Sequence, residues 1–270
     1  MLAAAALHAT WNALVRGGSD PLLHMAAVVG WTGVIGFPAL FFLPLPSAES
    51  ALVMVASVII HIAYYITLAG AYRNGNLSTI YPIIRGCAPL MISIGSLIFL
   101  NETLDGADWL GVLMISSGVL VIAMRSGLDN VGRALKWALA CSLTIAIYTI
   151  IDGYGARVSG NSLSFAAWLF VTESIAFWLV LVALGRGKAL KIYVSERLRN
   201  TALAGVLSAI GYTVVLWAMS QAPLALVSAT RETSVLFACI LAAVLLKETI
   251  RPRQVIGALV IVSGLIAMRL

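Results

Sequence analysis

The sequence predicts an all-α integral membrane protein with ten transmembrane helices, arranged as two inverted five-helix repeats around a central cavity. The first indication is composition, because the 270 residues are 61% hydrophobic and only 10% charged, with a mean hydropathy of +1.01. A soluble domain carries about 25% charged residues, so this chain lacks the charge to cover a surface in water. Its long apolar runs suit membrane-spanning helices rather than the short alternating strands of a transmembrane barrel.

An internal repeat is the second indication. Residues 78–124 form a long apolar run, a short acidic hinge and another apolar run, and the chain from Leu224 onward repeats this plan. Equivalent positions lie 146 residues apart, and they pair Arg85 with Arg231, Glu102 with Glu248, Thr103 with Thr249, Gly111 with Gly257, and Gly118 with Gly264. Repetition of this kind indicates a duplicated structural unit.

Ten apolar segments follow one another along the chain, and each predicts one helix. They cover residues 2–16, 22–44, 50–72, 78–100, 107–125, 133–153, 162–184, 201–220, 222–246 and 252–269. The first segment is short, because a span requires about 20 residues. The longest polar connection runs from Gly185 to Asn200 and is too short for a soluble domain.

These segments divide into two units of five, residues 1–125 and 126–270. Because five is odd, the second unit enters the membrane from the opposite side, and the two copies are inverted. Inverted repeats are typical of secondary transporters, which bind substrate near the membrane midplane between the repeats. The alternative is a duplicated membrane protein without such a site.

Loop charges predict an orientation and small residues predict the packing. Thirteen Lys and Arg residues follow the odd-numbered segments, against two on the other face, which places both termini away from the cytoplasm by the positive-inside rule.

The pairs Gly111 with Gly118 and Gly257 with Gly264 are seven residues apart and predict close helix packing within the chain rather than a dimer seam. The chain is expected to be a monomer or a homodimer.

The hinges NETL and KETI, each followed by a last helix that carries glycines, and the first-helix motif HATWNALVR resemble the EamA-type transporters of the drug/metabolite transporter superfamily. The resemblance covers the whole chain. It implies a ten-helix basket that moves small metabolites, often amino acids or their relatives, and that binds no cofactor. Family members usually place both termini in the cytoplasm, opposite to the loop charges, so the orientation stays open. We expect a multi-pass protein of the cell membrane, the inner membrane in a bacterium.

Charged residues within spans are costly and tend to face a cavity or pair with each other. Four lie well inside apolar segments, and they are Arg85, Glu173, Arg231 and Glu232. Two guanidiniums can clamp a carboxylate or phosphate in bidentate fashion, which predicts an anionic or zwitterionic substrate. The structural alternative is that each arginine pairs with one of the two glutamates or extends to the membrane interface.

Glu173, in the middle of segment seven, is the candidate proton-coupling residue, and protons are the candidate coupling ion. The alternative for Glu173 is a fixed ion pair with Arg85 or Arg231. Glu232 is assigned to helix packing, and His61 to packing rather than to a proton relay. Polar and aromatic residues at helical spacing are expected to line the cavity, and they are His8, Trp11, Asn12, Tyr64, Tyr81 and Tyr148.

Other classes of site are excluded by what the sequence lacks. Cys87, Cys141 and Cys239 lie in apolar runs without metal-ligand spacing, which predicts buried thiols and no metal site. The net charge of +6 is scattered over short loops, unlike a nucleic-acid surface. There is no Walker loop, HExxH, GxSxG or CxxC, so active transport has to draw on an ion gradient or on the gradient of the substrate itself.

The sequence therefore predicts a secondary active transporter of small metabolites that works by alternating access, and not an enzyme. One alternative is a proton-coupled exporter of cationic drugs, which the two arginines disfavour because a positive cavity repels cations. The alternatives from another class are a membrane-embedded enzyme and an assembly subunit. An enzyme would need a cluster of His, Asp or Ser residues at a membrane interface, and the sequence offers only single residues far apart.

Overall fold

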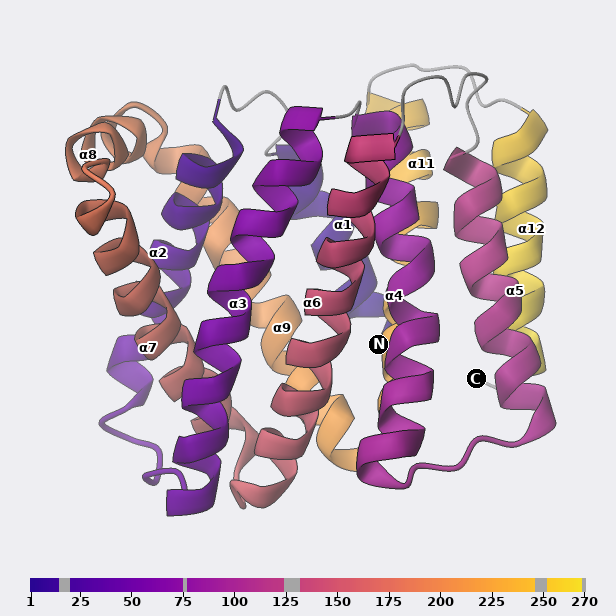
Figure 1. Ribbon diagram of the computed structural model, residues 1–270, viewed down its shortest axis with the longest axis horizontal. Helices are drawn as coiled ribbons and strands as arrows, with labels where there is room; N and C mark the ends of the chain where they lie inside the picture. The colour runs from indigo at the N-terminus through magenta and orange to yellow at the C-terminus, as the bar shows by residue number, and fades with distance from the viewer. Residues whose placement is uncertain (15–19, 75–76, 124–131, 246–251, 269–270) are drawn as a thin grey trace.

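The computed structural model describes residues 1–14, 20–74, 77–123, 132–245 and 252–268. These residues are helical apart from short connections, and the helices stand side by side in one bundle (Figure 1). The helices are α1 (Leu2–Leu14), α2 (Pro21–Ala39), α3 (Ala48–Asn74), α4 (Leu77–Leu100), α5 (Gly106–Ala123), α6 (Gly132–Val158), α7 (Ser162–Ala183), α8 (Gly187–Glu196), α9 (Leu198–Gln221), α10 (Leu224–Arg231), α11 (Ser234–Leu245) and α12 (Pro252–Ala267).

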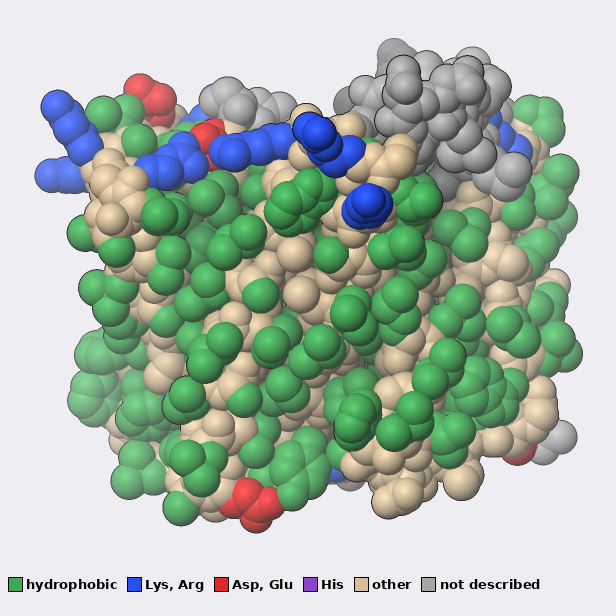
Figure 2. Space-filling model, viewed as in Figure 1, with side chains coloured by type: hydrophobic (Ala, Val, Ile, Leu, Met, Phe, Trp, Pro, Cys, Tyr) green, Lys and Arg blue, Asp and Glu red, His purple; other side chains and the backbone are tan. Residues whose placement is uncertain are grey.

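Each predicted apolar segment contains at least one of these helices. In the described part of the chain, α2, α3, α4, α6, α7 and α9 are long and apolar enough to cross a membrane, and α5 and α12 are shorter apolar helices. Hydrophobic side chains cover the lateral face in view, whereas Lys and Arg gather at the edge that carries α8 (Figure 2). A multi-pass membrane protein presents such a surface to lipid. The total of ten spans stays a prediction.

The ends of α2 and α7 are set by local sequence and joined by an ion pair. Asp20 caps α2 by accepting hydrogen bonds from the amides of Leu22 and Leu23, with Pro21 as the first helical residue. At the end of α7, Gly185 has a φ of 72°, the left-handed conformation that closes many helices. Nη2 of Arg186, the next residue, lies 2.5 Å from Oδ2 of Asp20.

Two sequence predictions are corrected by the fold. The stretch from Gly185 to Asn200 is not a plain polar connection, because it contains α8 and the start of α9. Leu190 and Tyr193 lie three residues apart in α8, and both pack into a core cluster with residues of α2 and α7. Their spacing of three residues places both side chains on one face of α8. Burial of this apolar face stabilises the helix, while the other face is exposed.

The ninth predicted segment, 222–246, is not one helix but two, α10 and α11. The break falls at Glu232 and Thr233, whose amides bond three residues back to the carbonyls of Ala229 and Thr230. Glu232 is completely buried and lies against Arg85 of α4. The continuous apolar run predicted one helix. The break could not be predicted, because the partner that holds Glu232 lies on a helix far away in the sequence.

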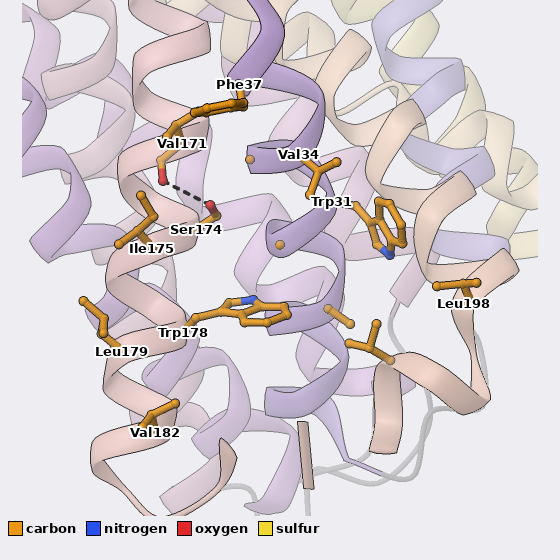
Figure 3. Close-up of a pocket in the computed structure, with 14 residues that line it drawn as sticks. Trp31, Val34, Phe37, Val171, Ser174, Ile175, Trp178, Leu179, Val182 and Leu198 are labelled. Carbon is orange, nitrogen blue, oxygen red and sulfur yellow. Dashed lines mark hydrogen bonds between the residues drawn. The ribbon is translucent and has the colours of Figure 1, made fainter. Parts of the chain in front are cut away.

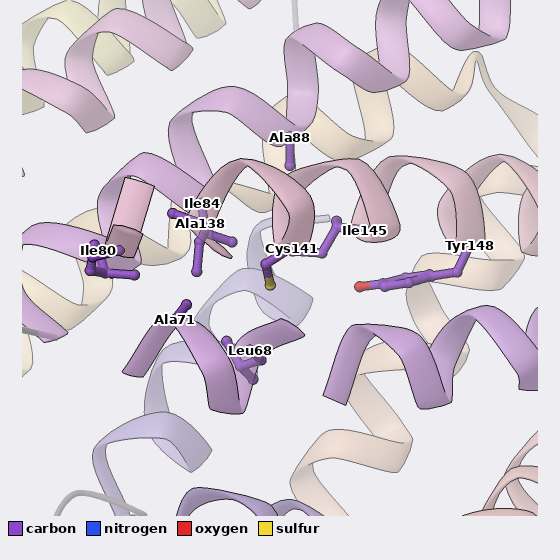
Figure 4. Packing of buried hydrophobic residues seen from close by; sticks show 10 residues of the cluster. Leu68, Ala71, Ile80, Ile84, Ala88, Ala138, Cys141, Ile145 and Tyr148 are labelled. Atoms are coloured by element: carbon purple, nitrogen blue, oxygen red, sulfur yellow. The ribbon is translucent and has the colours of Figure 1, made fainter. Parts of the chain in front are cut away.

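Packing at the centre of the bundle relies on small residues. Leu68 and Ala71 of α3 pack in one cluster with residues of α4 and α6, among them Ala88, Ala138 and Cys141 (Figure 4). The thiol of Cys141 is thus buried as predicted, but the prediction was wrong for Cys87 and Cys239, which are only partly buried. Alanine at these positions lets the helix backbones come close, in line with the small residues found at membrane helix interfaces.

The glycine pairs pack α5 against α12, as predicted for contacts within the chain. A Cβ atom on Gly111 would lie 2.7 Å from the carbonyl oxygen of Gly264, and one on Gly118 would lie 2.8 Å from that of Gly257. Only glycine fits at such distances. Because Gly111 meets Gly264 and Gly118 meets Gly257, the two helices run in opposite directions.

Candidate functional site

Two hollows stand out in the described part of the molecule. The larger, about 820 Å³, is an apolar groove between α2 and α7 that opens onto the lateral surface (Figure 3). The smaller, about 110 Å³, lies inside the bundle and carries buried charged groups. We assign the candidate functional site to this central cavity, because buried charges that are not needed for packing mark functional sites in membrane proteins.

Both sequence units contribute to the central cavity. It is lined by residues of α1, α2, α3 and α4 from the first unit and of α6, α7, α9 and α10 from the second. The lining contains six of the predicted site residues, and they are His8, Tyr64, Arg85, Tyr148, Glu173 and Arg231. Tyr81 lies one turn before Arg85 on α4 but is not part of the lining. The side chains of Trp11 and Asn12 lie outside the described residues.

The two predicted arginines have different surroundings. Nε of Arg85 lies 2.7 Å from Oε2 of Glu232, and both side chains are buried. The structural alternative for Arg85, an ion pair with Glu232, is therefore present. Arg231 is only 4% exposed, and its Nε and Nη2 have no hydrogen-bond partner. Among the described residues no carboxylate lies within ion-pair distance of Arg231.

The repeat explains this difference. Glu232 follows Arg231 directly, and the position that follows Arg85 in the first unit is Gly86. The first unit therefore offers no carboxylate to Arg231 at the position from which Glu232 reaches Arg85. A Cβ atom on Gly86 would lie 2.7 Å from Leu120, so that position is occupied by helix packing. A buried guanidinium without an anion is costly, which favours the binding of an anion from outside the chain.

The alternative interpretation of Glu173, a fixed ion pair with Arg85 or Arg231, is not found in the described structure. Its carboxylate accepts a hydrogen bond from the hydroxyl of Tyr65, whose ring stacks on Phe177 with 4.4 Å between the centroids. Glu173 is 5% exposed and lines the same cavity as Arg231. Among the described residues, the cavity wall thus holds a guanidinium that forms no ion pair and a carboxyl group that forms none with an arginine or a lysine.

A polar network beside the cavity was missed as a site. The hydroxyls of Ser57 and Tyr212 both donate to Asp152, and Nε2 of His61 lies 3.8 Å from Oδ2 of Asp152. The ring of His61 stacks on Tyr148 at 4.1 Å. Asp152 lies one turn after Tyr148 on α6. The spacing of Ser57 and His61, four residues apart in an apolar segment, was the available signal.

The hinge motif NETL has a structural partner that the sequence did not predict. Glu102 lies 2.5 Å from Nη2 of Arg157 at the end of α6, and its other oxygen accepts a hydrogen bond from the amide of Leu224, which begins α10. Arg157 also donates to the carbonyls of Met219 and Ala222. Through Glu102 and Arg157, the hinge that follows α4 therefore contacts the ends of α6 and α9 and the start of α10. Its counterpart Glu248 lies outside the described residues.

No group of three or more His, Cys, Asp or Glu side chains is placed to hold a metal ion in the ranges that the structure describes. The arrangement that remains is chemically simple. It can hold a small ligand by charge and hydrogen bonding, with Arg231 for an anionic group, Glu173 for a cationic group or a proton, and aromatic rings around them.

Comparisons with known proteins concern the family and the fold. A family model described as the EamA-like transporter family matches residues 132–270, which is 139 of the 270 residues. One solved structure, described as "Crystal structure of protein", is 17% identical and has a TM-score of 0.72, over 98% of this chain and 93% of that chain. At this level of identity the likeness extends to the fold alone.

Proposed function

The chain belongs to the EamA-like transporter family, and from that membership and the charges around the central cavity we propose a secondary active transporter of small anionic or zwitterionic metabolites. Amino acids and related carboxylates are the favoured substrates. The observation that carries the proposal is Arg231, a buried guanidinium without an anion in the wall of the cavity. A substrate carboxylate would supply the missing charge and the missing hydrogen bonds.

The size of the cavity supports a small substrate. Its volume of about 110 Å³ equals only a few water molecules at about 30 Å³ each, whereas pockets for drug-sized ligands have about 300–1,000 Å³. The position of Glu173 in the same wall suits the ammonium group of a zwitterion. Glu173 is also our candidate for proton coupling, because a carboxylate in the membrane interior can exchange a proton as the substrate arrives or leaves.

We also propose that the two units are inverted repeats and that transport proceeds by alternating access. The contacts between helices support this, because equivalent pairs recur. Helix α3 of the first unit packs on α6 of the second, and α1 packs on α9 in the same way. The antiparallel packing of α5 on α12, which hold equivalent positions in the repeat, is what inversion across the membrane requires. The membrane concerned would be the inner membrane of a bacterium.

The test is a thermal-shift assay of the purified protein with glycine, L-alanine, L-glutamate, succinate, phosphonoacetate and ethylamine. A ligand that binds only the folded state raises the melting temperature. At least one carboxylate should stabilise the parent chain and not Arg231→Gln, and Arg231→Lys should keep part of the effect. The matched control is Arg73→Gln, an exposed arginine at the end of α3, which should respond as the parent does.

Vesicles that contain the protein then test for transport of the stabilising ligand. Stabilisation of Arg231→Gln equal to that of the parent would contradict the role of Arg231. A response to ethylamine alone would favour the exporter of cationic drugs. Binding without flux would favour an enzyme, and a stable complex with another membrane protein together with no flux would favour an assembly subunit.

A further inference from the structure

We propose that the groove between α2 and α7 binds an acyl chain of an anionic phospholipid, whose phosphate lies beside the basic residues around α8 and the start of α9. This proposal concerns a different surface from the central cavity, and it holds whether or not the protein transports carboxylates. The groove is the larger hollow of about 820 Å³, and Val34, Leu179 and Val182 of its lining are exposed.

The shape of the groove fits one chain in one leaflet. Its α7 wall runs along one helical face from Val171 to Val182, and its α2 wall runs from Ala27 to Phe37. At 1.5 Å per residue, the α7 wall is about 16 Å long. This is about half of the roughly 30 Å hydrocarbon thickness of a bilayer. Gly30 and Gly33 lie in this lining and let α7 pack closely on α2, because a Cβ atom on Gly30 would lie 2.7 Å from the ring of Trp178.

The chemistry of the lining suits hydrocarbon and not a polar headgroup. Its only polar side chains are Trp31, Ser174 and Trp178, and each already donates its hydrogen bond within the protein. The indole of Trp178 donates to the carbonyl of Ala26 at 2.8 Å and that of Trp31 to Thr201 at 3.2 Å, while Ser174 donates to the carbonyl of Val171 (Figure 3). What the groove offers to a ligand is apolar surface, including two indole faces.

Charge at one end of the groove selects the headgroup. Val194 and Leu198 line that end, at the edge of the molecule where Lys and Arg gather (Figure 2). Five basic residues and one acidic residue lie between positions 186 and 199. Arg186 is paired with Asp20, but Arg197 forms no ion pair among the described residues and lies over the ring of Tyr193 at 5.1 Å. Arg197 directly precedes Leu198, so a phosphate above the chain would meet it.

The test uses quenching of tryptophan fluorescence in phosphatidylcholine vesicles that contain a minor fraction of phosphatidylglycerol. Bromine is placed on the acyl chains of either the phosphatidylglycerol or an equal fraction of the phosphatidylcholine. Brominated phosphatidylglycerol should quench the fluorescence more strongly than brominated phosphatidylcholine. This difference in quenching should be smaller in Trp178→Phe. The preference should fall by about fivefold in Arg197→Gln, the effect of one basic group near a membrane surface. Val34→Phe, which narrows the groove without adding an indole, should weaken quenching of Trp178 by both lipids.

Two controls separate this site from general attraction to the basic edge. Arg73→Gln removes another basic residue next to an odd-numbered connection, and Ile59→Trp places an indole at a lipid-facing position outside the groove, where Ile59 is 60% exposed. Neither should change the preference. Equal quenching by the two brominated lipids, or an equal loss in Arg73→Gln and Arg197→Gln, would overturn the proposal. Should Arg197→Gln fail to fold, quenching in Val34→Phe equal to that in the parent would overturn it instead.

Discussion

Arg85 and Arg231 occupy equivalent positions in the repeat, and one neighbouring residue makes their chemistry different. Glu232 neutralises Arg85, while Gly86 leaves Arg231 without a carboxylate from the first unit. A symmetric site with two neutralised arginines would hold no anion, and one with two unpaired arginines would carry a high desolvation cost. The difference between Gly86 and Glu232 at equivalent positions therefore leaves one guanidinium for the proposed substrate and keeps the other in an ion pair.

Tyr212 provides a test of the network around Asp152. Tyr212→Phe should lower the free energy of unfolding by about 1–3 kcal/mol, because it removes one donor from a completely buried carboxylate. The matched control is Tyr154→Phe, which removes a similar bond to Glu49 at a site where Tyr154 is 37% exposed. That change should cost less, because water can replace the lost partner at an exposed site. Denaturation of both variants in the same detergent gives the comparison, and equal losses would show that Asp152 does not depend on Tyr212.

Asp20 provides a test by pH. Partial burial raises the pKa of Asp20, but the guanidinium of Arg186 and the amides of Leu22 and Leu23 outweigh it, so the pKa lies below its ordinary value. Its ionised form therefore adds stability above about pH 4, the pKa in the unfolded chain, and this part is lost as the pH falls through the lowered value. Asp20→Asn keeps the helix cap and removes the charge.

The parent should consequently melt at a higher temperature than Asp20→Asn at pH 7. The gap between the two melting temperatures should close as the pH is lowered from about 4 toward 2. A gap that stays constant over this range would mean that the charge of Asp20 does not contribute to the stability of the folded protein.

Helix α5 and helix α12 are held by the absence of side chains at four glycines. Gly118→Ala would bring its Cβ to 2.8 Å from the backbone oxygen of Gly257, and backbone cannot move aside as a flexible side chain can. The expected loss of stability is about 1–3 kcal/mol. Gly106→Ala, at the start of the same helix, meets nothing within 4 Å and should be neutral or slightly stabilising. The measurement is the melting temperature of each variant. Equal melting temperatures for Gly118→Ala and Gly106→Ala would contradict the close packing.

Across the whole molecule, charge should define which face is cytoplasmic. Ser47 lies in the connection between α2 and α3, and Lys188 lies in α8 at the basic edge. In a chain without Cys87, Cys141 and Cys239, we expect Ser47→Cys to react with an impermeant maleimide from outside the cell and Lys188→Cys to react only after the membrane is opened. The reverse result would place both termini in the cytoplasm, as the family resemblance implies. Reaction of both from one side would contradict the arrangement of the helices.

Composition, apolar periodicity and the repeat at 146 residues identified the class of protein from the sequence alone, because lipid demands long apolar helices and duplication copies their order. The same reasoning found six residues of the cavity wall, including the arginine that carries the proposed function, since charges within spans are rare and therefore conspicuous. The glycine pairs also predicted their own role, because close packing of helices leaves a regular spacing in the sequence.

The tertiary structure alone decided which charges meet. That Glu232 pairs with Arg85, that Glu173 bonds to Tyr65 and that Asp152 joins Ser57 and Tyr212 all depend on helices that are distant in the chain. The break between α10 and α11 and the burial of one face of α8 depend on such neighbours too. Local sequence specifies where a helix forms in lipid, but the partner of a buried polar group is set by packing in three dimensions, where a shift of one residue turns a side chain by about 100°.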